Sequence, residues 1–318
     1  MTNAVKYSIV VPVYRNAESI PHLIDRLRAI SVQLDGTLEA IFVVDGSPDD
    51  SHELLAALLP EAGFTAQLLE LSRNFGSFAA IRSGMEHAKG SYIAVMAADL
   101  QEPPELVLEF FRILSSGAAD VTVGRREGRD DPTLSRWSAS AFWRLYRKTV
   151  FPDMPEGGVD IFACNRAVAA EILQLQESRS SLVGLLYWVG FRRAEVPYQR
   201  LAREHGTSGW SLRKKVRYLL DSIFSFTDLP LSMVIAVGFI GGVLTLAATA
   251  VVIVAYLSGS ISEPGYTPLM LVILFSTFSL LSALGIVGSY VWRAFENTKR
   301  RPSAIVMNRL DIDDRANA

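Results

Sequence analysis

Residues 231–257 read LSMVIAVGFIGGVLTLAATAVVIVAYL, and this stretch divides the chain into two parts of different character. It contains no Asp, Glu, Lys or Arg, and a second uncharged apolar run follows at 266–292. Each run exceeds the roughly 20 residues that a helix needs to cross a bilayer. The sequence therefore predicts a two-helix transmembrane hairpin after a segment of ordinary, mixed composition.

Basic residues flank the two runs on the same side of the predicted hairpin. They are Arg213, Lys214, Lys215 and Arg217 before the first run, and Arg293, Lys299, Arg300 and Arg301 after the second. The connecting loop at 258–265 carries only Glu263. Because positive charge favours the cytoplasmic side, both termini are expected there. We expect a multi-pass protein of the inner or plasma membrane whose larger, N-terminal part is cytoplasmic.

Glycines recur inside both apolar runs, where they would let the two helices pack closely. They are Gly238, Gly241, Gly242, Gly285 and Gly288. A dinucleotide-binding fingerprint is disfavoured, since it would lie between a strand and a helix. Self-association into a homo-oligomer through these spans stays open.

Residues 211–229 are predicted to form an amphipathic juxtamembrane helix. Its apolar positions recur at helical spacing and are Leu212, Val216, Leu219, Leu220, Ile223 and Phe224. A basic helix of this kind is typical of one lying on anionic lipid. The alternative is an ordinary helix packed on the preceding domain. The expected organisation is a catalytic domain at 1–210, this helix, a membrane module at 230–293, and a tail at 294–318 that is partly disordered after Pro302.

Charge and cysteine content narrow the function classes. The 31 basic residues are balanced by 33 acidic ones, which argues against a nucleic-acid-binding face. The single cysteine, Cys164, cannot form an intramolecular disulfide, which suits a domain kept in a reducing compartment.

The first part of the chain alternates strand-like with helix-like patterns. Expected strands lie at 8–13, 40–44, 67–71, 92–96 and 120–123, and expected helices at 19–31, 48–59, 78–88 and 104–116. Continuous apolar strands in this order indicate an α/β fold with a Rossmann-like, mostly parallel sheet covered by helices on both faces. Ligands of such sheets bind at the carboxyl ends of the strands.

Polar residues follow several of these strands directly. Asp45 ends the second strand, where a carboxylate can accept hydrogen bonds from a nucleobase or ribose, whereas Ser47 or Asp49 could simply cap the next helix. Asp99 and Gln101 offer oxygens on one side of a loop, as a divalent ion bridging a diphosphate requires. Helix capping explains that loop equally well.

Arginines form a third candidate group. Arg125 and Arg126 end a strand, and Arg200, Arg203 and His205 precede Trp210. Arginine binds phosphate through paired hydrogen bonds, so such a cluster suits an anionic substrate, and solvated surface charge is the alternative.

The order of motifs resembles that of a known enzyme family. The motifs are VPVYRN at 11–16, VDGSPD at 44–49, SRNFG at 72–76, ADLQEPPE at 98–105, and VPY at 196–198 with Arg203, Gly206, Ser208 and Trp210. Together with the paired apolar runs they resemble family 2 glycosyltransferases of GT-A fold. Within that family they resemble the polyprenyl-phosphate glycosyltransferases, the type that includes dolichyl-phosphate mannose synthase and bactoprenol glucosyltransferase.

The resemblance implies inverting transfer of a sugar from a nucleotide sugar, with a UDP-sugar as first choice, to a polyprenyl phosphate such as undecaprenyl phosphate. It implies nucleotide-sugar binding by Pro12, Tyr14, Asp45, Ser47, Arg73 and Asp99. It further implies a Mg²⁺ or Mn²⁺ ion held by Asp99 and Gln101, and an acceptor phosphate held by Arg125, Arg203 and Ser208. Asp160, Asp99, Arg125 and Arg203 would be the catalytic residues.

Two other functions stay open. A processive polysaccharide synthase would share the fold, but its usual Gln-x-x-Arg-Trp segment is missing and two spans are few for a polymer channel. A nucleotide-sugar-binding membrane protein with weakened catalysis is the other, because Ala97 and Val44 stand where the family usually has acidic residues, and Phe162 where it has an arginine. An acceptor phosphate is largely dianionic at neutral pH, so Asp160 could orient an arginine or a sugar hydroxyl rather than remove a proton.

Overall fold

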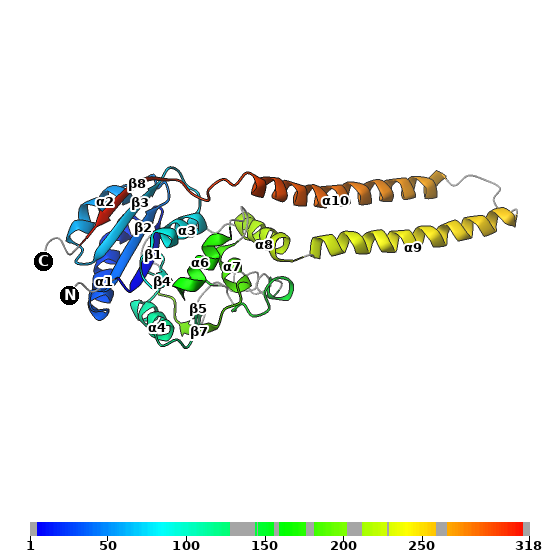
Figure 1. Cartoon of the computed structure of the whole chain (residues 1–318). Coiled ribbons are helices and arrows are strands. Elements are labelled where there is room, and N and C mark those ends of the chain that lie inside the picture. The colour runs from blue at the N-terminus through cyan, green and yellow to red at the C-terminus, as the bar shows by residue number, and fades with distance from the viewer. Residues whose placement is uncertain are drawn as a thin grey trace.

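The computed structural model of the chain describes residues 5–127, 144, 146–155, 159–175, 181–201, 212–227, 229–258 and 266–313. Figure 1 shows an α/β domain from which two long helices extend to one side. The strands and helices expected between residues 8 and 123 are all present, with small shifts at their ends.

The elements of the domain follow one another as alternating strands and helices. In chain order they are β1 (Tyr7–Val13), η1 (Ala17–Ser19), α1 (Ile20–Gln33), β2 (Leu38–Val44), α2 (Ser51–Leu58), η2 (Leu59–Glu61), β3 (Thr65–Leu71), α3 (Ser77–His87), β4 (Tyr92–Val95), α4 (Pro104–Ser115) and β5 (Val121–Arg126). There follow β6 (Phe162–Asn165), α6 (Arg166–Gln174), α7 (Leu182–Trp188), β7 (Arg193–Tyr198), α8 (Leu212–Phe226), α9 (Leu229–Leu257), α10 (Tyr266–Thr298) and β8 (Val306–Ile312).

The strands form one 8-stranded sheet in the order β7-β5-β6-β4-β1-β2-β3-β8. β1 lies between β2 and β4 and is parallel to both, and β3 continues the parallel set beside β2. β6 is antiparallel to both of its neighbours, β4 and β5, and β8 is antiparallel to β3. The expected Rossmann-like sheet is therefore confirmed, with two antiparallel strands that the sequence did not reveal.

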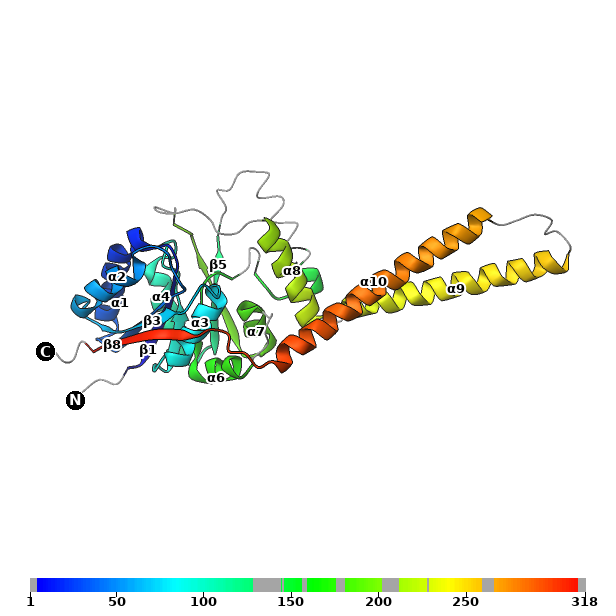
Figure 2. The same ribbon diagram turned by 90° about the horizontal axis from the view of Figure 1, so that it is seen from above.

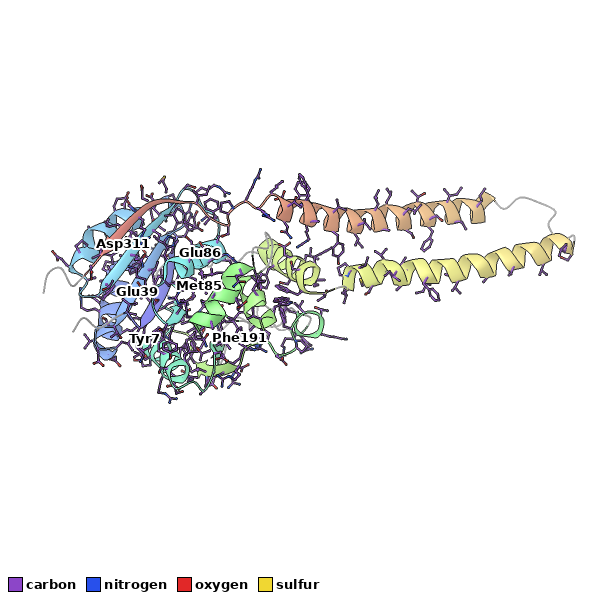
Figure 3. All side chains as sticks on the ribbon, in the orientation of Figure 1. Tyr7, Glu39, Met85, Glu86, Phe191 and Asp311 are labelled. Atoms are coloured by element: carbon purple, nitrogen blue, oxygen red, sulfur yellow. The ribbon has the colours of Figure 1, made fainter. Side chains whose placement is uncertain are left out.

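Helices cover both faces of the sheet, as Figure 2 shows from above. Ile9 and Val11 of β1 pack in a core with α1, α2 and α4, whereas Val10 points to the other core with α3, α6 and α7. This alternation follows from the two-residue period of a strand. Figure 3 labels Met85 of α3, which is completely buried in the second core. α3 lies so close to β1 that a Cβ on Gly84 would be 2.3 Å from Val10.

The chain returns to the sheet after α10. β8 pairs with β3 from Ala66↔Ile312 to Leu71↔Val306, and the Asn308 amide donates to the Glu70 carboxylate at 2.6 Å. The expectation of a partly disordered tail after Pro302 is therefore wrong for this segment. The side chains in the middle of β8 are exposed, so the strand lacks the buried apolar pattern by which the sequence would reveal it.

α8 packs on the α/β domain with one face. The Tyr218 ring stacks on Tyr146 with centroids 5.7 Å apart, and the Tyr146 hydroxyl donates to Ser222 at 3.2 Å. Phe226 lies against Gly184 of α7, where a Cβ would be 2.4 Å from its ring. Packing on the domain, the alternative left open by the sequence, is confirmed for this face, and contact with lipid stays a prediction.

Arg293 of α10 joins the long helices to α8. Its guanidinium donates to the Asp221 carboxylate at 2.8 Å and to the Ser225 hydroxyl at 3.2 Å. It also lies 5.0 Å from the centre of the Phe224 ring, within range of a cation–π interaction. α8 is therefore held between the α/β domain and α10.

α9 runs away from the domain and α10 returns toward it, and the two helices contact each other (Figure 1). Within the described residues, one helical segment, Phe275–Thr298, is long and apolar enough to cross a membrane. Tyr218–Phe226 and Leu229–Gly241 together meet the same criteria, although they are bent by 76° relative to each other. Crossing by both α9 and α10 remains a prediction.

Four of the glycines in the two long helices lie beside open space. Among the described residues, a Cβ added at Gly238, Gly241, Gly285 or Gly288 would meet no atom within 4 Å. The expectation that these glycines allow close packing between α9 and α10 is therefore wrong for these four positions.

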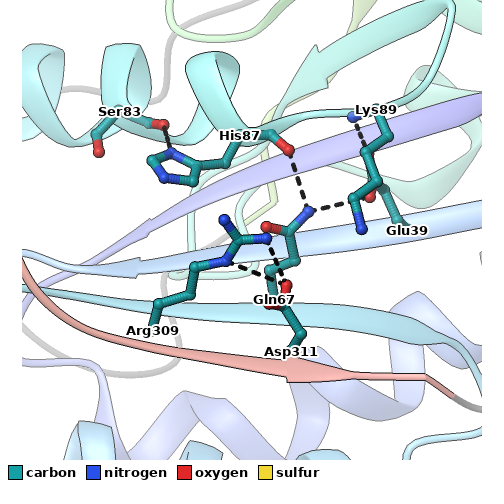
Figure 4. Close-up of polar contacts among 7 residues, drawn as sticks. All are labelled: Glu39, Gln67, Ser83, His87, Lys89, Arg309 and Asp311. Atoms are coloured by element: carbon teal, nitrogen blue, oxygen red, sulfur yellow. Dashed lines mark hydrogen bonds and ion pairs between the residues drawn. The ribbon is translucent and has the colours of Figure 1, made fainter.

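A buried carboxylate joins the amino ends of β1, β2 and β3. Glu39 is 0% exposed and accepts hydrogen bonds from the Ser8 hydroxyl at 2.6 Å and from the Gln67 amide at 3.2 Å. It also accepts from the backbone amides of Lys89 and Gly90, which follow α3. Figure 4 shows Glu39, Gln67 and Lys89 in this arrangement. Without the carboxylate, the Ser8 hydroxyl and the Lys89 amide would lose their acceptor. The Gln67 amide would keep the His87 carbonyl, and the Gly90 amide would keep the Ser8 hydroxyl.

Glu39→Ala is expected to lower the free energy of unfolding by about 3 kcal/mol, because the Ser8 hydroxyl and the Lys89 amide would lose their acceptor in the protein interior. Denaturant unfolding of the detergent-solubilised chain measures this loss. Glu53→Ala on the exposed face of α2 is the matched control and should change stability by less than about 0.5 kcal/mol. Equal effects of the two variants would contradict the assigned role of Glu39.

Candidate functional site

The carboxyl ends of β1, β2, β3 and β4 meet along one edge of the sheet because these strands are parallel. We call the loops that follow them, residues 14–16, 45–50, 72–76 and 96–103, the carboxyl edge. The motif residues that follow these four strands are therefore brought to one edge, as expected. Ligands of parallel α/β sheets bind at this edge.

Asp45 joins the loop after β2 to the loop after β3. It is 3% exposed, and its two carboxylate oxygens accept from the backbone amides of Phe75 at 2.7 Å and Gly76 at 2.8 Å. Burial raises the pKa of Asp45 above its usual value, although these hydrogen bonds and the nearby Arg73 oppose the shift. Asp45 thus joins the loops after β2 and β3, and its direct contact with a nucleotide stays a prediction.

Gly46 allows these two loops to touch. Its φ is +55°, in the left-handed region, and a Cβ there would lie 2.4 Å from the backbone carbon of Arg73. Both observations exclude a side chain at this position without a shift of the backbone.

Ser47 and Asp49 join the loop after β2 to the loop after β1. The Ser47 hydroxyl accepts from the amide of Arg15 at 2.7 Å and donates to Asp49 at 2.5 Å, and Asp49 also accepts from the amide of Ala17 at 3.2 Å. Burial raises the pKa of Asp49, but hydrogen bonds from Ser47, Ser51 and Ala17 outweigh it and leave the pKa below its usual value. Asp49 therefore connects two loops, beyond the simple helix cap left open by the sequence.

Tyr14 and Arg73 present side chains to solvent at the carboxyl edge. Tyr14 is 42% exposed directly after β1, and the Arg15 guanidinium lies 5.5 Å from the centre of its ring. Arg73 lies 3.9 Å from the centre of the Phe75 ring. Pro12 is part of β1 itself and is only partly buried. An exposed aromatic ring and an exposed guanidinium suit a base and a phosphate respectively.

We call residues 97–102 the acidic loop. Asp99 is partly exposed there and accepts from the amide of Gln101 at 3.3 Å. The Gln101 side chain donates to the Leu201 carbonyl at 3.3 Å, and the Leu201 amide donates back to the Gln101 carbonyl at 2.9 Å. Gln101 therefore ties the loop to the segment after β7, a contact that its expected role as a metal ligand did not include.

Glu102 is a site residue that the sequence did not identify. It is 2% exposed, and its Oε2 has no hydrogen-bond partner among the described residues. Burial, followed by the negative charges of Asp99 and Asp160, raises the pKa of Glu102 to about 7, although Arg200 opposes the shift. Its position in a polar run gives no sign of burial, because burial depends on segments far away in the sequence.

Arg125 and Arg126 point to opposite faces of β5. Arg126 forms an ion pair with Asp160, and its buried Nε has no partner among the described residues. Arg125 is 47% exposed and lies 3.5 Å from Glu127 and 3.6 Å from Glu195. The structure therefore places Arg126, rather than Arg125, beside the expected catalytic residue Asp160.

The side chains around Asp99 supply only one or two ligands for a hard divalent ion, the smallest number that such an ion commonly takes from a protein. No group of three or more His, Cys, Asp or Glu side chains within the described residues is arranged to hold a metal. Asp99 supplies a carboxylate with the buried Glu102 nearby, and Mg²⁺ in phosphate-transfer sites commonly takes only one or two carboxylates. Arg203 and Ser208, the other predicted acceptor ligands, lie outside the described residues.

Comparison with known proteins agrees with this geometry. The family model described as Glycosyl transferase family 2 matches residues 8–174. An uncharacterized glycosyltransferase of Synechocystis sp. is 32% identical to the chain over 95% of each sequence. The bactoprenol glucosyl transferase of Shigella phage SfV is 30% identical over 95% of this chain and 98% of its own.

The name of a third relative includes a carrier lipid. The undecaprenyl-phosphate 4-deoxy-4-formamido-L-arabinose transferase of Pseudomonas syringae is 29% identical over 93% of this chain and 88% of its own sequence. These names agree with the polyprenyl-phosphate type indicated by the sequence motifs. The chain belongs to glycosyl transferase family 2 and is a glycosyltransferase.

Proposed function

We propose that this glycosyltransferase moves a sugar, with inversion, from a nucleotide sugar to the phosphate of a polyprenyl carrier such as undecaprenyl phosphate at the cytoplasmic face of the membrane. The observation that carries the proposal is the extent of the match. The relative named bactoprenol glucosyl transferase aligns with 95% of this chain and so shares the length that holds α9 and α10, beyond the family domain at 8–174.

The loops after β1, β2 and β3 form the proposed binding site for the nucleotide. Tyr14 and Arg73 offer an exposed ring and an exposed guanidinium, whereas Asp45 and Ser47 hold the loops that carry them. Pro12 belongs to the same edge at the end of β1. A UDP-sugar is the first donor to test.

Asp99 is the proposed protein ligand of a Mg²⁺ or Mn²⁺ ion, with Gln101 tying the same loop to Leu201. When bound, such an ion would neutralise charge on the departing nucleoside diphosphate. Burial raises the pKa of the Glu102 carboxyl group, and Glu102 lies close enough to Asp99 that the negative charge of Asp99 raises this pKa further.

Arg126 and Asp160 form the proposed acceptor side. A guanidinium binds phosphate through parallel hydrogen bonds, and the ion pair with Asp160 fixes its direction. An oxygen of the acceptor phosphate then forms a bond to the anomeric carbon as the bond to the nucleoside diphosphate breaks. The phosphate is largely ionised at neutral pH, so positioning and charge stabilisation dominate over proton removal.

The end of α10 has the features of a membrane boundary. Trp292 and Phe295 are 50% and 53% exposed, and the Lys299 ammonium lies 5.3 Å and 4.4 Å from the centres of their rings. Exposed aromatic rings beside a lysine are typical of the membrane–water interface. We infer that α9 and α10 both span the inner or plasma membrane and that α8 lies at its cytoplasmic surface.

A transfer assay tests the reaction directly. The purified chain is incubated with a panel of nucleotide sugars, undecaprenyl phosphate, and Mg²⁺ or Mn²⁺ against a chelator, and products are detected by mass. A metal-dependent polyprenyl-phosphate sugar is the expected product. Saturable binding of a nucleotide sugar by the folded protein, with no product across the panel, would contradict the proposal and favour a binding protein.

Asp99→Ala is expected to reduce transfer by at least about 100-fold, because a charge-stabilising group at the departing diphosphate is lost. The unfolding midpoint should stay near that of the wild type, since Asp99 is not part of the buried core. Asp153→Ala removes a carboxylate that is 79% exposed and is the control. Near-normal turnover of the Asp99 variant would refute the assigned role.

Arg126→Met and Arg125→Met discriminate between two neighbouring arginines. We expect Arg126→Met to lower kcat/KM for the polyprenyl phosphate by about 100-fold, and Arg125→Met by less than about threefold, because only Arg126 is aligned by Asp160. Steady-state kinetics with varied acceptor measure both. The reverse order would restore Arg125 as the phosphate ligand.

Membrane topology can be measured with single engineered cysteines, because the native Cys164 is buried. Ser258→Cys at the end of α9 should react with a membrane-impermeant thiol reagent added outside intact cells. Ser303→Cys beyond α10 should react only after the cells are opened. Labelling of both positions in intact cells, or of neither, would contradict the proposed hairpin.

A further inference from the structure

Side chains of α1 and of the residue before it bind the backbone of the acidic loop. The Ser19 hydroxyl, just before α1, donates to the Ala98 carbonyl at 2.7 Å. One nitrogen of the Arg26 guanidinium, Nη1, donates to the Leu100 carbonyl at 2.9 Å and to the Glu102 carbonyl at 3.0 Å. Three alternate carbonyls of residues 98–102 are therefore bound by Ser19, which precedes α1, and by Arg26 within it.

The backbone of this loop requires such support. Leu100 has a φ of +61°, in the left-handed region that residues other than glycine rarely adopt. Strained conformations of this kind persist only where the surroundings enforce them. Leu100 itself is 7% exposed and packs in the core that contains α1 and α4. The loop is thus fixed by two kinds of contact: the Leu100 side chain packs in the core, and the carbonyl groups accept hydrogen bonds from Ser19 and Arg26.

The reversal at Leu100 determines how Asp99 is presented. The Asp99 carboxylate accepts from the amide of Gln101, across the residue with positive φ. If the carbonyls of Leu100 and Glu102 lost their shared donor, the reversal could relax, and both Asp99 and Glu102 would move with it. The position of Asp99 therefore depends on a residue that lies outside the carboxyl edge.

We propose that Arg26 is a positioning residue for the transfer reaction, which fixes the Asp99 carboxylate for a divalent ion by binding the backbone of the acidic loop. This inference rests on the proposed function for its reaction. Arg26 acts through hydrogen bonds to carbonyl groups, so a lysine can replace it in part and a methionine cannot.

Arg28 provides a matched control on the same helix. Its Nε donates to the Ala62 carbonyl at 2.9 Å and its Nη2 to the Glu61 carbonyl at 3.2 Å, so it also binds backbone carbonyls of a loop. That loop precedes β3 and lies at the opposite end of the strand from the carboxyl edge. Arg26→Met and Arg28→Met thus remove the same kind of contact at two ends of the sheet.

The test measures metal binding and turnover separately in the full-length purified chain. Mn²⁺ is titrated in the presence of UDP and followed by electron paramagnetic resonance, without turnover. Arg26→Met is expected to weaken Mn²⁺ binding by about tenfold or more, as loss of a group that supports a metal ligand commonly does. Arg26→Lys should recover part of the loss, and Arg28→Met should bind Mn²⁺ as the wild type does.

Transfer assays and thermal unfolding complete the experiment. The Mg²⁺ concentration for half-maximal transfer should rise for Arg26→Met in parallel with the weaker Mn²⁺ binding, while both methionine variants lose similar thermal stability. Wild-type Mn²⁺ affinity in Arg26→Met, or an equal loss in Arg28→Met, would overturn the proposal. If Arg26→Met does not fold, Arg26→Lys decides the matter by the same comparison of Mn²⁺ affinity. Absence of transfer by the wild type would refute the proposed function alone, because Mn²⁺ affinity still tests Arg26.

Discussion

β1 is hydrogen-bonded along both edges, to β2 and to β4, and its apolar side chains are buried on both faces. Because it has no freedom to shift, the residues that follow it can emerge only between the loops after β2 and β4. The same constraint places the parallel β3 one strand further along, so four loops converge whatever their sequences are. The chemistry of the site is then decided by which side chains in those loops remain available to a ligand.

Many polar groups at the carboxyl edge serve the protein backbone rather than a ligand. Asp45 binds the amides of Phe75 and Gly76, Asp49 binds that of Ala17, and Gln101 binds the Leu201 carbonyl. These contacts make each loop dependent on its neighbour, since buried or half-buried polar groups need partners. The number of polar residues in the motifs thus exceeds the number that can touch a substrate, and the two sets can be separated only in three dimensions.

From β1 to β5, the sequence predicted the strands, which are continuously apolar, and the helices, which are amphipathic, because both patterns are local in the sequence. It did not reveal β8, whose side chains are mostly exposed. The choice between Arg125 and Arg126 depends on the register of β5 against β6 and β7, which no local pattern contains. Glu102 was missed for a related reason, since its burial is created by segments far away along the chain.

Asn308 and Glu70 are 238 positions apart in the chain and are joined by a hydrogen bond between β8 and β3. β8 is synthesised after α9 and α10, so β3 leaves the ribosome with an unpaired edge and keeps it until both long helices have been made. An unpaired strand edge is a site of aggregation. Biogenesis therefore has a built-in order: the sheet can be completed only when the helical pair has been made and the following segment can return to it. A product stopped before residue 306 would lack β8 and would therefore differ from the finished protein by an open edge at β3.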